Sequence, residues 1–574
     1  MGLIGTALQI GRSALLSYQS ALQIVGNNIS NAGSDEYTRQ SARLSPQMGA
    51  FLPEGMQAGS GVALVALQRN VDESVENRLR LGLSDQGTAM TQREAIGRLE
   101  SVLNELSDYD LSTLLEQFFG SFSSLQNNPH DQSARGIVLT AGESLVNEIG
   151  RQSKDALTLV DEINKELVDL TTQVDRIASE VATLNVQIVE AESRASGQAS
   201  ALRDQRDSKL RELSGLIEVQ VRAQDNGSIN VYIGNEPLVQ AGLARGLITE
   251  TRIDADGIER VEVQYADTHG AIALLGGRIE GLVTSRDSYA LGHMRDLDTL
   301  ARSLVHEVNK VHSQGQGLVG FTDVTSTNAV ADVGAALNTA AAGLDLTPRT
   351  GSFQIWVTDT TTGTSVATTI HVDLDGLNGD DTTLATLATA IDGVDSVTAT
   401  VQADRRIRIS AANGYEITFG EDSSHALAAV GINTFFTGRM ATDIKVNPVL
   451  AADSRLLAAA KTNFAGDKPG DGDNAGAISE VGRQTTATLN GLSVVEFYNR
   501  VAGNVATNGY AARAAQSATD AIMASLQAQR ESLSGVSLDE EALQLVRMER
   551  AFQGAARYVS VVDELINELL AIAR

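Results

Sequence analysis

Cysteine is absent from the 574 residues of the sequence. Disulfide bonds, thiolate zinc sites and cysteine nucleophiles are therefore excluded. Aromatic residues make up only 4 % of the chain, so its hydrophobic cores must be built mainly from Leu, Val, Ile and Ala. No run of about 18 apolar residues occurs, and the first residues lack an apolar segment followed by a cleavage site. We therefore expect neither a membrane-spanning helix nor a cleaved signal peptide.

Basic residues are also few: 44 Lys and Arg stand against 72 Asp and Glu, which gives a formal net charge of -28 at pH 7. Binding to nucleic acid requires a basic surface that neutralises phosphates, and anionic lipids repel an acidic surface. We therefore expect no nucleic acid and no membrane among the partners. Because the chain is too long for a single hydrophobic core, we expect several domains.

The N-terminal region predicts a helix with one apolar stripe, because apolar positions recur at alternating intervals of three and four residues. The stripe contains Leu8, Gly11, Leu15, Tyr18, Leu22, Val25 and Ile29. The polar residues Asn27, Asn28 and Asn31, followed by Gly33, favour a helix end and a turn.

The C-terminal region predicts a second helix with the same rhythm. Ser537 is placed to cap it, and Glu540 and Glu541 fall in its first turn, where acidic side chains are favourable. A lone helix cannot bury an apolar stripe in water, so we expect the two ends to pair as a coiled coil, or to pair with neighbouring subunits. Two ordinary helices on separate cores are the alternative. The second stripe contains Leu545, Met548, Phe552, Ala555, Val559, Val562, Ile566 and Leu569.

Helical and strand-rich stretches alternate between the two ends. Residues 153–216 keep helical spacing, and a further helix is predicted over residues 288–312. Alternating residues around Asp225-Asn226-Gly227 predict a β-hairpin. Residues 321–434 read as strand pairs, and Trp356 gives one strand apolar groups on both faces, which indicates a central strand. The other predicted inward positions are Ile355, Val357, Ile370, Val372, Ile407, Ile409, Ile417 and Phe419.

The predicted fold class is multidomain α + β. A long helical bundle or coiled coil is formed by the N- and C-terminal regions, and β-rich domains are inserted in the middle. The predicted domains are a terminal coiled coil (1–70 with 535–574), a helical body (71–216 with 286–320 and 437–534), a β-rich segment (217–285) and a β-rich inserted domain (321–436).

Motifs of common enzyme and metal sites do not occur. His306 and His312 are six residues apart, whereas a metalloprotease helix needs two His four apart on one face. Residues 471–476 begin like a calcium loop, but two later ligand positions lack oxygen side chains, so a solvated loop is expected. Residues 373–381 are acidic enough to bind a cation loosely. We predict no catalytic residue, no cofactor and no metal site.

The stretch ALQIVGNNISNAGSDEYTRQ resembles the N-terminal signature of the flagellar axial proteins, a family of rod, hook and junction subunits. Residues 34–36 depart from the Thr-Pro-Gly of that family, so the turn there is expected to be less rigid. The resemblance is carried by Ala21, Leu22, Asn27, Asn28, Ile29, Ser30, Asn31, Ala32, Tyr37, Thr38 and Arg39.

Further segments resemble the hook-associated members of this family. They are ALRDQRDSKLREL, LDTLARSLVHEVNKVHSQGQGLVG, GINTFFTGRMATDIKVNPVLAADSRLLAAA and the last helix, and they follow the family's order. The resemblance implies a structural subunit of the bacterial flagellum that assembles at the hook–filament junction and adapts the hook to the filament. It implies that the protein acts outside the cell after export without a cleaved signal peptide.

The resemblance also implies partners. These are other copies of the chain in a junction ring, the flagellar hook protein, a second hook–filament junction protein, and a flagellar export chaperone at the C-terminal helix. From the two stripes and the motif, we predict as assembly residues Leu15, Leu22, Asn27, Asn28, Ile29, Asn31, Leu545, Phe552, Val559 and Ile566.

Two alternatives stay open at this point. One is another axial protein, such as a hook protein or a flagellin-like subunit, although the RDQRD and FFTG segments argue against both. The other is a secreted enzyme or adhesin that carries its activity in the insertion of residues 321–436.

Overall fold

The computed structural model describes residues 2–34, 36–51, 57–104, 110–193, 199–461 and 471–572. The chain divides into two compact units. Unit 1 comprises Met1–Ala95, Asp161–Ser285 and Ala511–Arg574, and unit 2 comprises Ile96–Val160 and Arg286–Tyr510.

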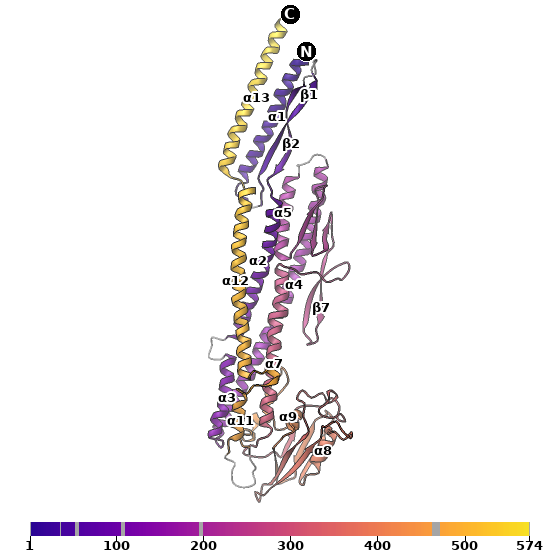
Figure 1. Cartoon of the computed structure of the whole chain (residues 1–574), viewed down its shortest axis with the longest axis vertical. Coiled ribbons are helices and arrows are strands. Elements are labelled where there is room, and N and C mark those ends of the chain that lie inside the picture. Colours follow the sequence, from indigo (N-terminus) through magenta and orange to yellow (C-terminus); the bar gives the residue numbers. More distant parts are fainter. Residues whose placement is uncertain are drawn as a thin grey trace. The chain divides into compact units, whose positions relative to one another are not determined.

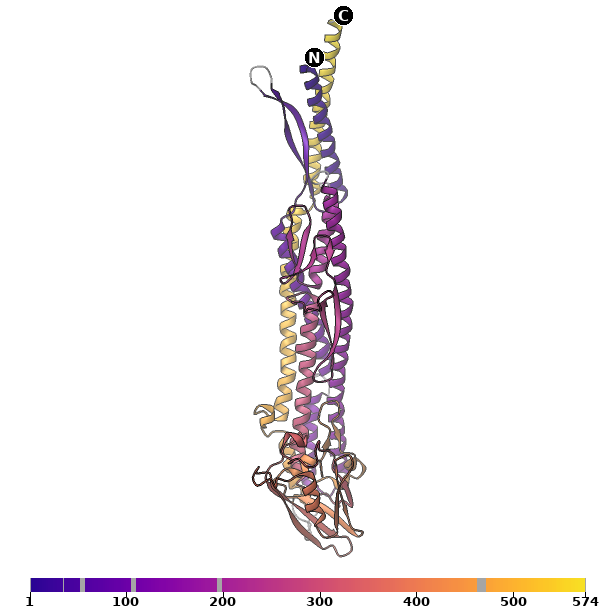
Figure 2. The same ribbon diagram turned by 90° about the vertical axis from the view of Figure 1, so that its right-hand side faces the viewer.

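The two chain ends are paired helices within unit 1. Helix α1 (Gly2–Ser30) packs against helix α13 (Leu538–Ile572), and both views show them side by side (Figure 1, Figure 2). Strands β1 (Gln40–Phe51) and β2 (Gln57–Arg69) form an antiparallel hairpin that also packs on α1. The predicted fold class is confirmed, including the helical pairing of the N- and C-terminal regions.

The rest of unit 1 combines long helices with two small sheets. One sheet has the order β3-β4-β5-β6, and β7 pairs with β8. The turn between β3 and β4 has Gly227 at φ 87°, a conformation that glycine adopts without strain, and the predicted hairpin is confirmed. The strands are β3 (Gln220–Ala223), β4 (Ile229–Ile233), β5 (Glu236–Gln240), β6 (Leu243–Ala244), β7 (Leu247–Ile253) and β8 (Glu259–Tyr265).

Two asparagines of helix α4 (Gln132–Glu192) hold these sheets to the helix. Asn185 donates to the Ile229 carbonyl at 2.8 Å and accepts from the Ile229 amide at 3.1 Å. Asn164 makes the same kind of pair with the backbone of β8. Each side chain therefore supplies hydrogen bonds that a neighbouring strand would otherwise supply. The other helices that contribute to unit 1 are α2 (Glu73–Leu103), α5 (Ser200–Leu216), α6 (Arg278–Thr284) and α12 (Val494–Ser534).

Unit 2 has a helical core around a cluster of phenylalanines. Phe118 and Phe122 of α3 meet Phe435 and Phe436, with ring centroids 4.7–5.5 Å apart. Asn309 fixes the latter pair, because its side chain bonds the backbone of both residues at 2.9 Å. The predicted helix over 288–312 begins at Leu291, after a π-helical turn over Ser285–Ala290. The helices here include α3 (Leu111–Asn127), α7 (Leu291–His312), α9 (Ala426–Val430), α10 (Pro448–Ala452) and α11 (Asp473–Val481).

The strand-rich part of unit 2 has its own core. Its two sheets have the orders β11-β10-β14 and β12-β13-β9, and helix α8 (Leu384–Asp392) packs on β12. The central position of β10 is confirmed, and Trp356 and the eight predicted inward residues are buried. The strands are β9 (Asp323–Thr325), β10 (Gly351–Asp359), β11 (Ser365–Val372), β12 (Val397–Val401), β13 (Ile407–Ala411) and β14 (Tyr415–Gly420), followed by β15 (Phe436–Thr437) and β16 (Lys445–Val446).

The buried core of this strand-rich part runs from Phe321 to Ile432. The four domains predicted from the sequence subdivide the chain more finely than the two compact units do, and that division stays a prediction. Across the described ranges, no helix has both the length and the apolar character that crossing a bilayer requires.

Candidate assembly site at the paired chain ends

Helix α1 approaches α13 most closely at Gly11. A Cβ atom built on Gly11 would lie 2.4 Å from Cγ2 of Val559 and 3.2 Å from Cδ1 of Tyr558. The first distance is shorter than carbon atoms tolerate and the second is tight, so a side chain at position 11 would require Val559 or the helices to shift. The glycine in the predicted stripe therefore allows Val559 to pack against the backbone of α1.

The buried side chain of Asn28 joins the end of α1 to two other segments. Its Nδ2 donates to the Gln40 carbonyl and to Oε2 of Glu541, both at 2.9 Å. Its Oδ1 accepts from the Tyr37 hydroxyl at 2.7 Å and from the Gln40 amide at 3.1 Å. A carboxamide has two donor hydrogens and two acceptor lone pairs, and all four are used here.

Arg39 completes the binding of Glu541, whose side chain is only 2 % exposed. Arg39 Nε donates to Oε1 of Glu541 at 2.8 Å, and Nη1 donates to Glu540 at 2.7 Å. The Arg39 amide also bonds the carbonyl of Ser534, the last residue of α12. A buried carboxylate is tolerated when charged and polar partners surround it, and Asn28 and Arg39 supply them. We call Asn28, Tyr37, Arg39, Gln40 and Glu541 the end-joining network.

The phenol of Tyr37 is held in its neutral form by this environment. Burial, reinforced by the charges of Asp204 and Glu541, raises the pKa of Tyr37 to about 12. The hydroxyl therefore stays protonated and donates to Asn28 over the physiological pH range.

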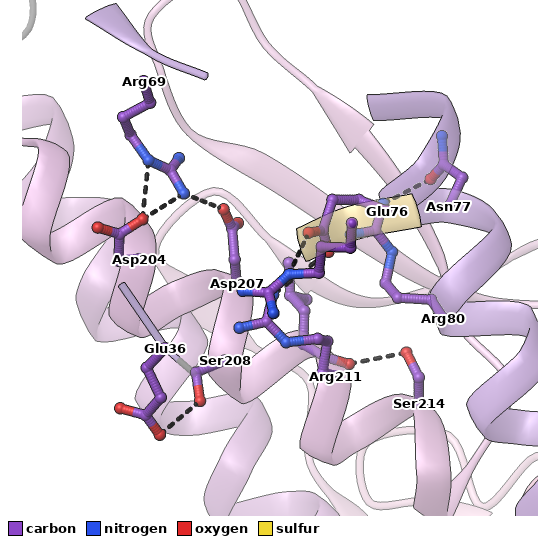
Figure 3. Close-up of polar contacts among 12 residues, drawn as sticks. Glu36, Arg69, Glu76, Asn77, Arg80, Asp204, Asp207, Ser208, Arg211 and Ser214 are labelled. Carbon is purple, nitrogen blue, oxygen red and sulfur yellow. Dashed lines mark hydrogen bonds and ion pairs between the residues drawn. The ribbon is translucent and has the colours of Figure 1, made fainter. Parts of the chain in front are cut away.

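A second polar cluster ties the base of the hairpin to α5 (Figure 3). Arg69, at the end of β2, donates to Asp204 at 2.6 and 2.9 Å and to Asp207 at 2.6 Å. Asp204 also accepts hydrogen bonds from Thr38. Burial raises the pKa of Asp204, while the contacts with Arg69 and Thr38 oppose that shift. The two aspartates are three residues apart and lie on one face of the helix.

A third cluster joins three helices of unit 1 through Glu76 of α2, which is almost fully buried. Its carboxylate accepts from Arg211 of α5 at 3.3 Å and from Arg530 of α12 at 3.1 Å. Close by, the hydroxyl of Ser208 donates to Glu36 at 3.0 Å (Figure 3). Of the turn at residues 34–36, Asp35 lies outside the described residues.

The sequence-predicted assembly residues occupy different environments. Leu15, Leu22 and Ile29 on α1, and Phe552, Val559 and Ile566 on α13, are half-buried. Asn28 is buried, whereas Asn27 and Asn31 are exposed and bond each other through Asn31 Nδ2 and the Asn27 carbonyl at 2.8 Å. Leu545 is 37 % exposed and lies at the edge of the stripe. Their role in assembly stays a prediction.

Sequence reasoning missed what Glu541 and Asp204 do. From the sequence, Glu541 is expected only in the first turn of a helix, and Asp204 lies in a matched segment without a predicted role. Two signals were present: the arginine and tyrosine of the N-terminal motif, and the spacing of Asp204 and Asp207 on one helical face. Neither signal identifies a partner that lies hundreds of residues away.

Among the described residues, one group of three acidic side chains is close enough together to share a metal ion. Asp373, Asp375 and Asp381 have carboxylate oxygens within 4.8 Å of one another, but acidic side chains on exposed loops often cluster in this way without a metal. Asp375 and Asp381 also accept backbone amides of the same loop, at 2.8 and 2.9 Å. We assign no metal to this cluster.

The histidine and calcium-like motifs are also structural. Nδ1 of His312 lies 2.8 Å from the Asn433 carbonyl, and Nε2 accepts from the Ala458 amide at 3.1 Å, so both nitrogens are engaged. The expectation of a solvated loop over 471–476 is wrong in its second half, because Asp473 begins α11. The side-chain Nδ2 of Asn474 donates to the Ala458 carbonyl at 2.7 Å, which orders this turn.

Taken together, the paired ends and their networks define a structural protein. The long terminal helices are joined by buried polar contacts, and these polar groups hold segments together instead of converging on a reacting centre.

Comparison with known proteins shows what this chain is similar to. Residues 96–325 match the family model described as "Flagellar hook-associated protein FlgK helical domain". Flagellar hook-associated protein 1 of Escherichia coli (strain K12) is 26 % identical over 573 residues, with 98 % of each chain covered. The proteins of the same name from Salmonella typhimurium and Bacillus subtilis are 27 % and 24 % identical, over 583 and 574 residues. They too cover 98 % of this chain, and 98 % and 97 % of their own lengths. The resemblance to the flagellar hook-associated proteins that the sequence motifs predict is confirmed, and it extends over nearly the whole chain.

The fold agrees with a solved structure of this kind. The flagellar hook junction protein FlgK from Burkholderia pseudomallei superposes with a TM-score of 0.51 at 15 % identity, covering 80 % of this chain and 100 % of that one. At this identity the likeness concerns the fold alone.

Proposed function

We propose that the protein is a structural subunit of the bacterial flagellum that assembles at the hook–filament junction and adapts the hook to the filament. The end-joining network carries this proposal. Asn28 and Glu541 are 513 positions apart, and their contact makes one helical pair of the two chain ends. The names of the relatives and of the solved structure support the location at the hook.

The partners follow from the exposed surface of the paired ends. On the face turned away from α1, α13 exposes large apolar side chains, including Leu543, Val561 and Leu565. Exposed apolar side chains that gather on one helix are typical of a surface that another protein covers. We assign this surface to neighbouring copies in a junction ring, and contacts along the axis to the hook protein and a second junction protein. Before assembly, an export chaperone would cover the same helix.

The proposed route and location are export without a cleaved signal peptide, followed by assembly outside the cell. The complete absence of cysteine supports this route, because a chain that crosses an export channel unfolded cannot then be trapped by a wrong disulfide.

A complementation experiment tests the function. A bacterium that lacks its own protein of this kind should make hooks but release its filament subunits into the medium, and expression of this chain should restore attached filaments. Glu541→Gln should reduce the restored filaments, because it weakens the contacts with Asn28 and Arg39. The matched control is Glu549→Gln on the exposed side of the same helix. A wild-type chain that leaves all filament subunits in the medium would refute the proposed function.

We further propose that the protein has no catalytic activity, including in the insertion of residues 321–436. Its acidic cluster is occupied in part by backbone amides, which supports a structural role. Hydrolysis of glycans or peptides by the purified full chain, lost on Asp381→Asn, would overturn this and favour a secreted enzyme.

A further inference from the structure

A pocket inside unit 2 lies between three helices and is separate from the polar networks of unit 1. The end of α2, the start of α7 and the first half of α12 line it, and its volume is about 160 Å³. That volume is close to the roughly 150 Å³ of an engineered protein cavity that binds benzene. The aliphatic part of its wall consists of Ile96, Leu99, Val501 and Val505.

The most deeply buried polar residue of this pocket is a histidine without a partner. His293 is 3 % exposed, and neither of its ring nitrogens has a hydrogen bond to any described residue. Buried polar groups are hydrogen-bonded in the great majority of cases, so this ring calls for a partner. Burial lowers the pKa of His293 to about 4. The ring is therefore neutral at pH 7, with one donor and one acceptor nitrogen.

A carboxylate stands on the same face of α7 as this histidine. Asp296 follows His293 by three residues, lines the same pocket and is half-buried. Burial raises its pKa, while the charges of Arg500 and Arg295 oppose that shift. Within the described ranges, however, no Lys or Arg side chain comes close enough to form an ion pair with it. A partly buried carboxylate in this position is stabilised by a cation that binds beside it.

Further polar groups lie at the mouth of the pocket. Asn504 and Asn508 are one helical turn apart on α12 and exposed, and each has a carboxamide oxygen that accepts hydrogen bonds. The π-helical turn over Ser285–Ala290 brings Ser288 to the same lining, and such turns are frequent at functional sites. The pocket thus combines aliphatic walls with several acceptors and one negative charge.

We propose that this pocket binds a small organic ammonium ion, with its charged group on Asp296 and His293 and an apolar part of about the size of one six-membered ring against the aliphatic walls. An ammonium group has N–H donors and no acceptor, so a carboxylate, an imidazole nitrogen and a carboxamide oxygen suit it together. Apolar pockets with a few convergent polar groups, lying between helices of a bundle, are typical small-molecule sites. The whole pocket belongs to one chain, so the site does not depend on assembly at the junction.

Gly292 keeps this pocket open. It precedes His293 in the first turn of α7 and lines the pocket. A Cβ atom built on Gly292 would meet no atom of another element within 4 Å. A larger side chain at this position would therefore enter the pocket without displacing the surrounding helices. Gly292→Leu fills the pocket and at the same time favours the helix.

Titration calorimetry of the purified full chain with benzylammonium chloride at pH 7 tests the ligand class. We expect saturable binding at one site per chain, with a dissociation constant of about 1 mM or below. Benzyl alcohol has the same ring without the charge, and benzoate has the opposite charge. Both should bind more weakly, by roughly tenfold or more, because they lack the charged hydrogen bond to Asp296. Equally tight binding of benzyl alcohol would show that only the ring is recognised and would overturn the proposal.

Two variants test the position of the site. Asp296→Asn should weaken the binding of benzylammonium by roughly tenfold or more, and Gly292→Leu should abolish it. The matched control is Glu143→Gln, which removes one exposed carboxylate of unit 2 outside the pocket and should bind as the wild type does. Thermal unfolding of each free variant, followed by circular dichroism, shows that it folds.

Three results would overturn the inference. If benzylammonium shows no saturable binding to the wild-type chain, the pocket holds ordered water only. If it binds Gly292→Leu as tightly as the wild type, it occupies another site. If Zn²⁺ binds instead, and both Asp296→Asn and His293→Leu lose it, the pocket is a metal site. None of these results touches the proposed function, which is measured by the attachment of filaments.

Discussion

Asn28 near the start of the chain donates a hydrogen bond of 2.9 Å to Glu541 near its end. Both side chains are buried, and each uses its polar atoms on partners from the other end of the sequence or from the intervening turn. A single buried polar pair of this kind fixes the register of two packed helices, because sliding one helix leaves both groups without partners.

Removing the Glu541 carboxylate should loosen both chain ends together. Glu541→Ala removes one acceptor from the buried Asn28 amide, which keeps only the Gln40 carbonyl, and one from the Arg39 guanidinium, which keeps only Glu540. This loss should cost about 3 kcal/mol. Hydrogen exchange of backbone amides in α1 and α13 measures this loss. The control is Glu540→Ala, because the side chain of Glu540 is 63 % exposed and exposed ion pairs contribute little. Equal exchange in the two variants would show that burial of Glu541 does not matter.

Gly11 and Gly26 should respond in opposite ways to the same substitution. Gly11→Ala should weaken the pairing of α1 and α13, because the added methyl group meets Val559. Gly26→Ala should stabilise α1 by about 0.5–1 kcal/mol, since nothing lies within 4 Å of its Cβ position and alanine is the better helix former.

The rate at which a protease trims the chain ends reports both effects. Gly11→Ala/Val559→Ala should recover part of the loss, because the smaller side chain makes room for the methyl group. If Gly11→Ala slowed trimming as much as Gly26→Ala does, the close contact at Gly11 would be refuted.

Phe552→Ala should impair assembly while leaving the rest of the molecule folded. Phe552 is half-buried on the α1 side of α13, and its truncation should cost about 3 kcal/mol where the ring is covered. The main thermal transition of the chain should remain, whereas junction assembly and chaperone binding should fall. Gln553→Ala, at the next position and exposed, is the control. If junction assembly and chaperone binding both stay at wild-type levels, the face of α13 that carries Phe552 is used for neither.

Two buried histidines of unit 2 should make the protein sensitive to acid. Burial lowers the pKa of His293 and of His312 from 6.5 to about 4. Between these values the unfolded chain binds protons that the folded chain does not, so the free energy of unfolding decreases as the pH falls. Each histidine should contribute a loss of about 3 kcal/mol across this interval.

Urea unfolding at pH 7 and at pH 4.5, followed by the circular dichroism of the helices, measures this loss. His293→Leu should reduce the difference in the free energy of unfolding between pH 7 and pH 4.5. The substitution removes no hydrogen bond, because neither ring nitrogen has a partner within the described ranges. His371→Leu, which replaces an exposed side chain on β11, is the matched control. If the difference in the free energy of unfolding is the same in His293→Leu as in the wild type, the acid sensitivity arises from other groups.

The strand-rich insertion should fold by itself. Its core is formed by residues between Phe321 and Ile432, and a segment with its own core can usually be separated from its host. A fragment of residues 321–436 should therefore unfold cooperatively, and a chain in which a short Gly/Ser linker replaces this segment should still assemble. A fragment without a cooperative transition would show that the insertion depends on its neighbours. A folded deletion variant that does not retain filaments would place a subunit contact in the insertion.

Periodicity predicted the elements well, because it depends only on neighbouring residues. The apolar residues that recur at intervals of three and four predicted α1, α13 and their pairing. The alternation around Trp356 predicted a central strand. The stripe on α13 was less accurate at its edges: Leu545 and Leu569 are exposed, since a repeat of seven residues drifts around a helix of 3.6 residues per turn. The π-helical turn before Leu291 left no periodic signal.

The polar networks could not be predicted in the same way. Whether Glu541 faces water or Asn28 depends on which helix lies opposite, and a single sequence does not state this. The same holds for Arg69 with Asp204, and for Glu76 with Arg530. The N-terminal motif pointed to the right residues through resemblance, but the chemistry of its tyrosine and arginine became clear only when Glu541 lay beside them.

The contact between Asn28 and Glu541 also has a consequence for incomplete chains. A polypeptide that stops anywhere before residue 541 lacks more than its last helix, because its first forty residues have lost the carboxylate that orders them. We therefore expect a truncated chain to expose the apolar side chains of α1 and to be cleaved there by proteases.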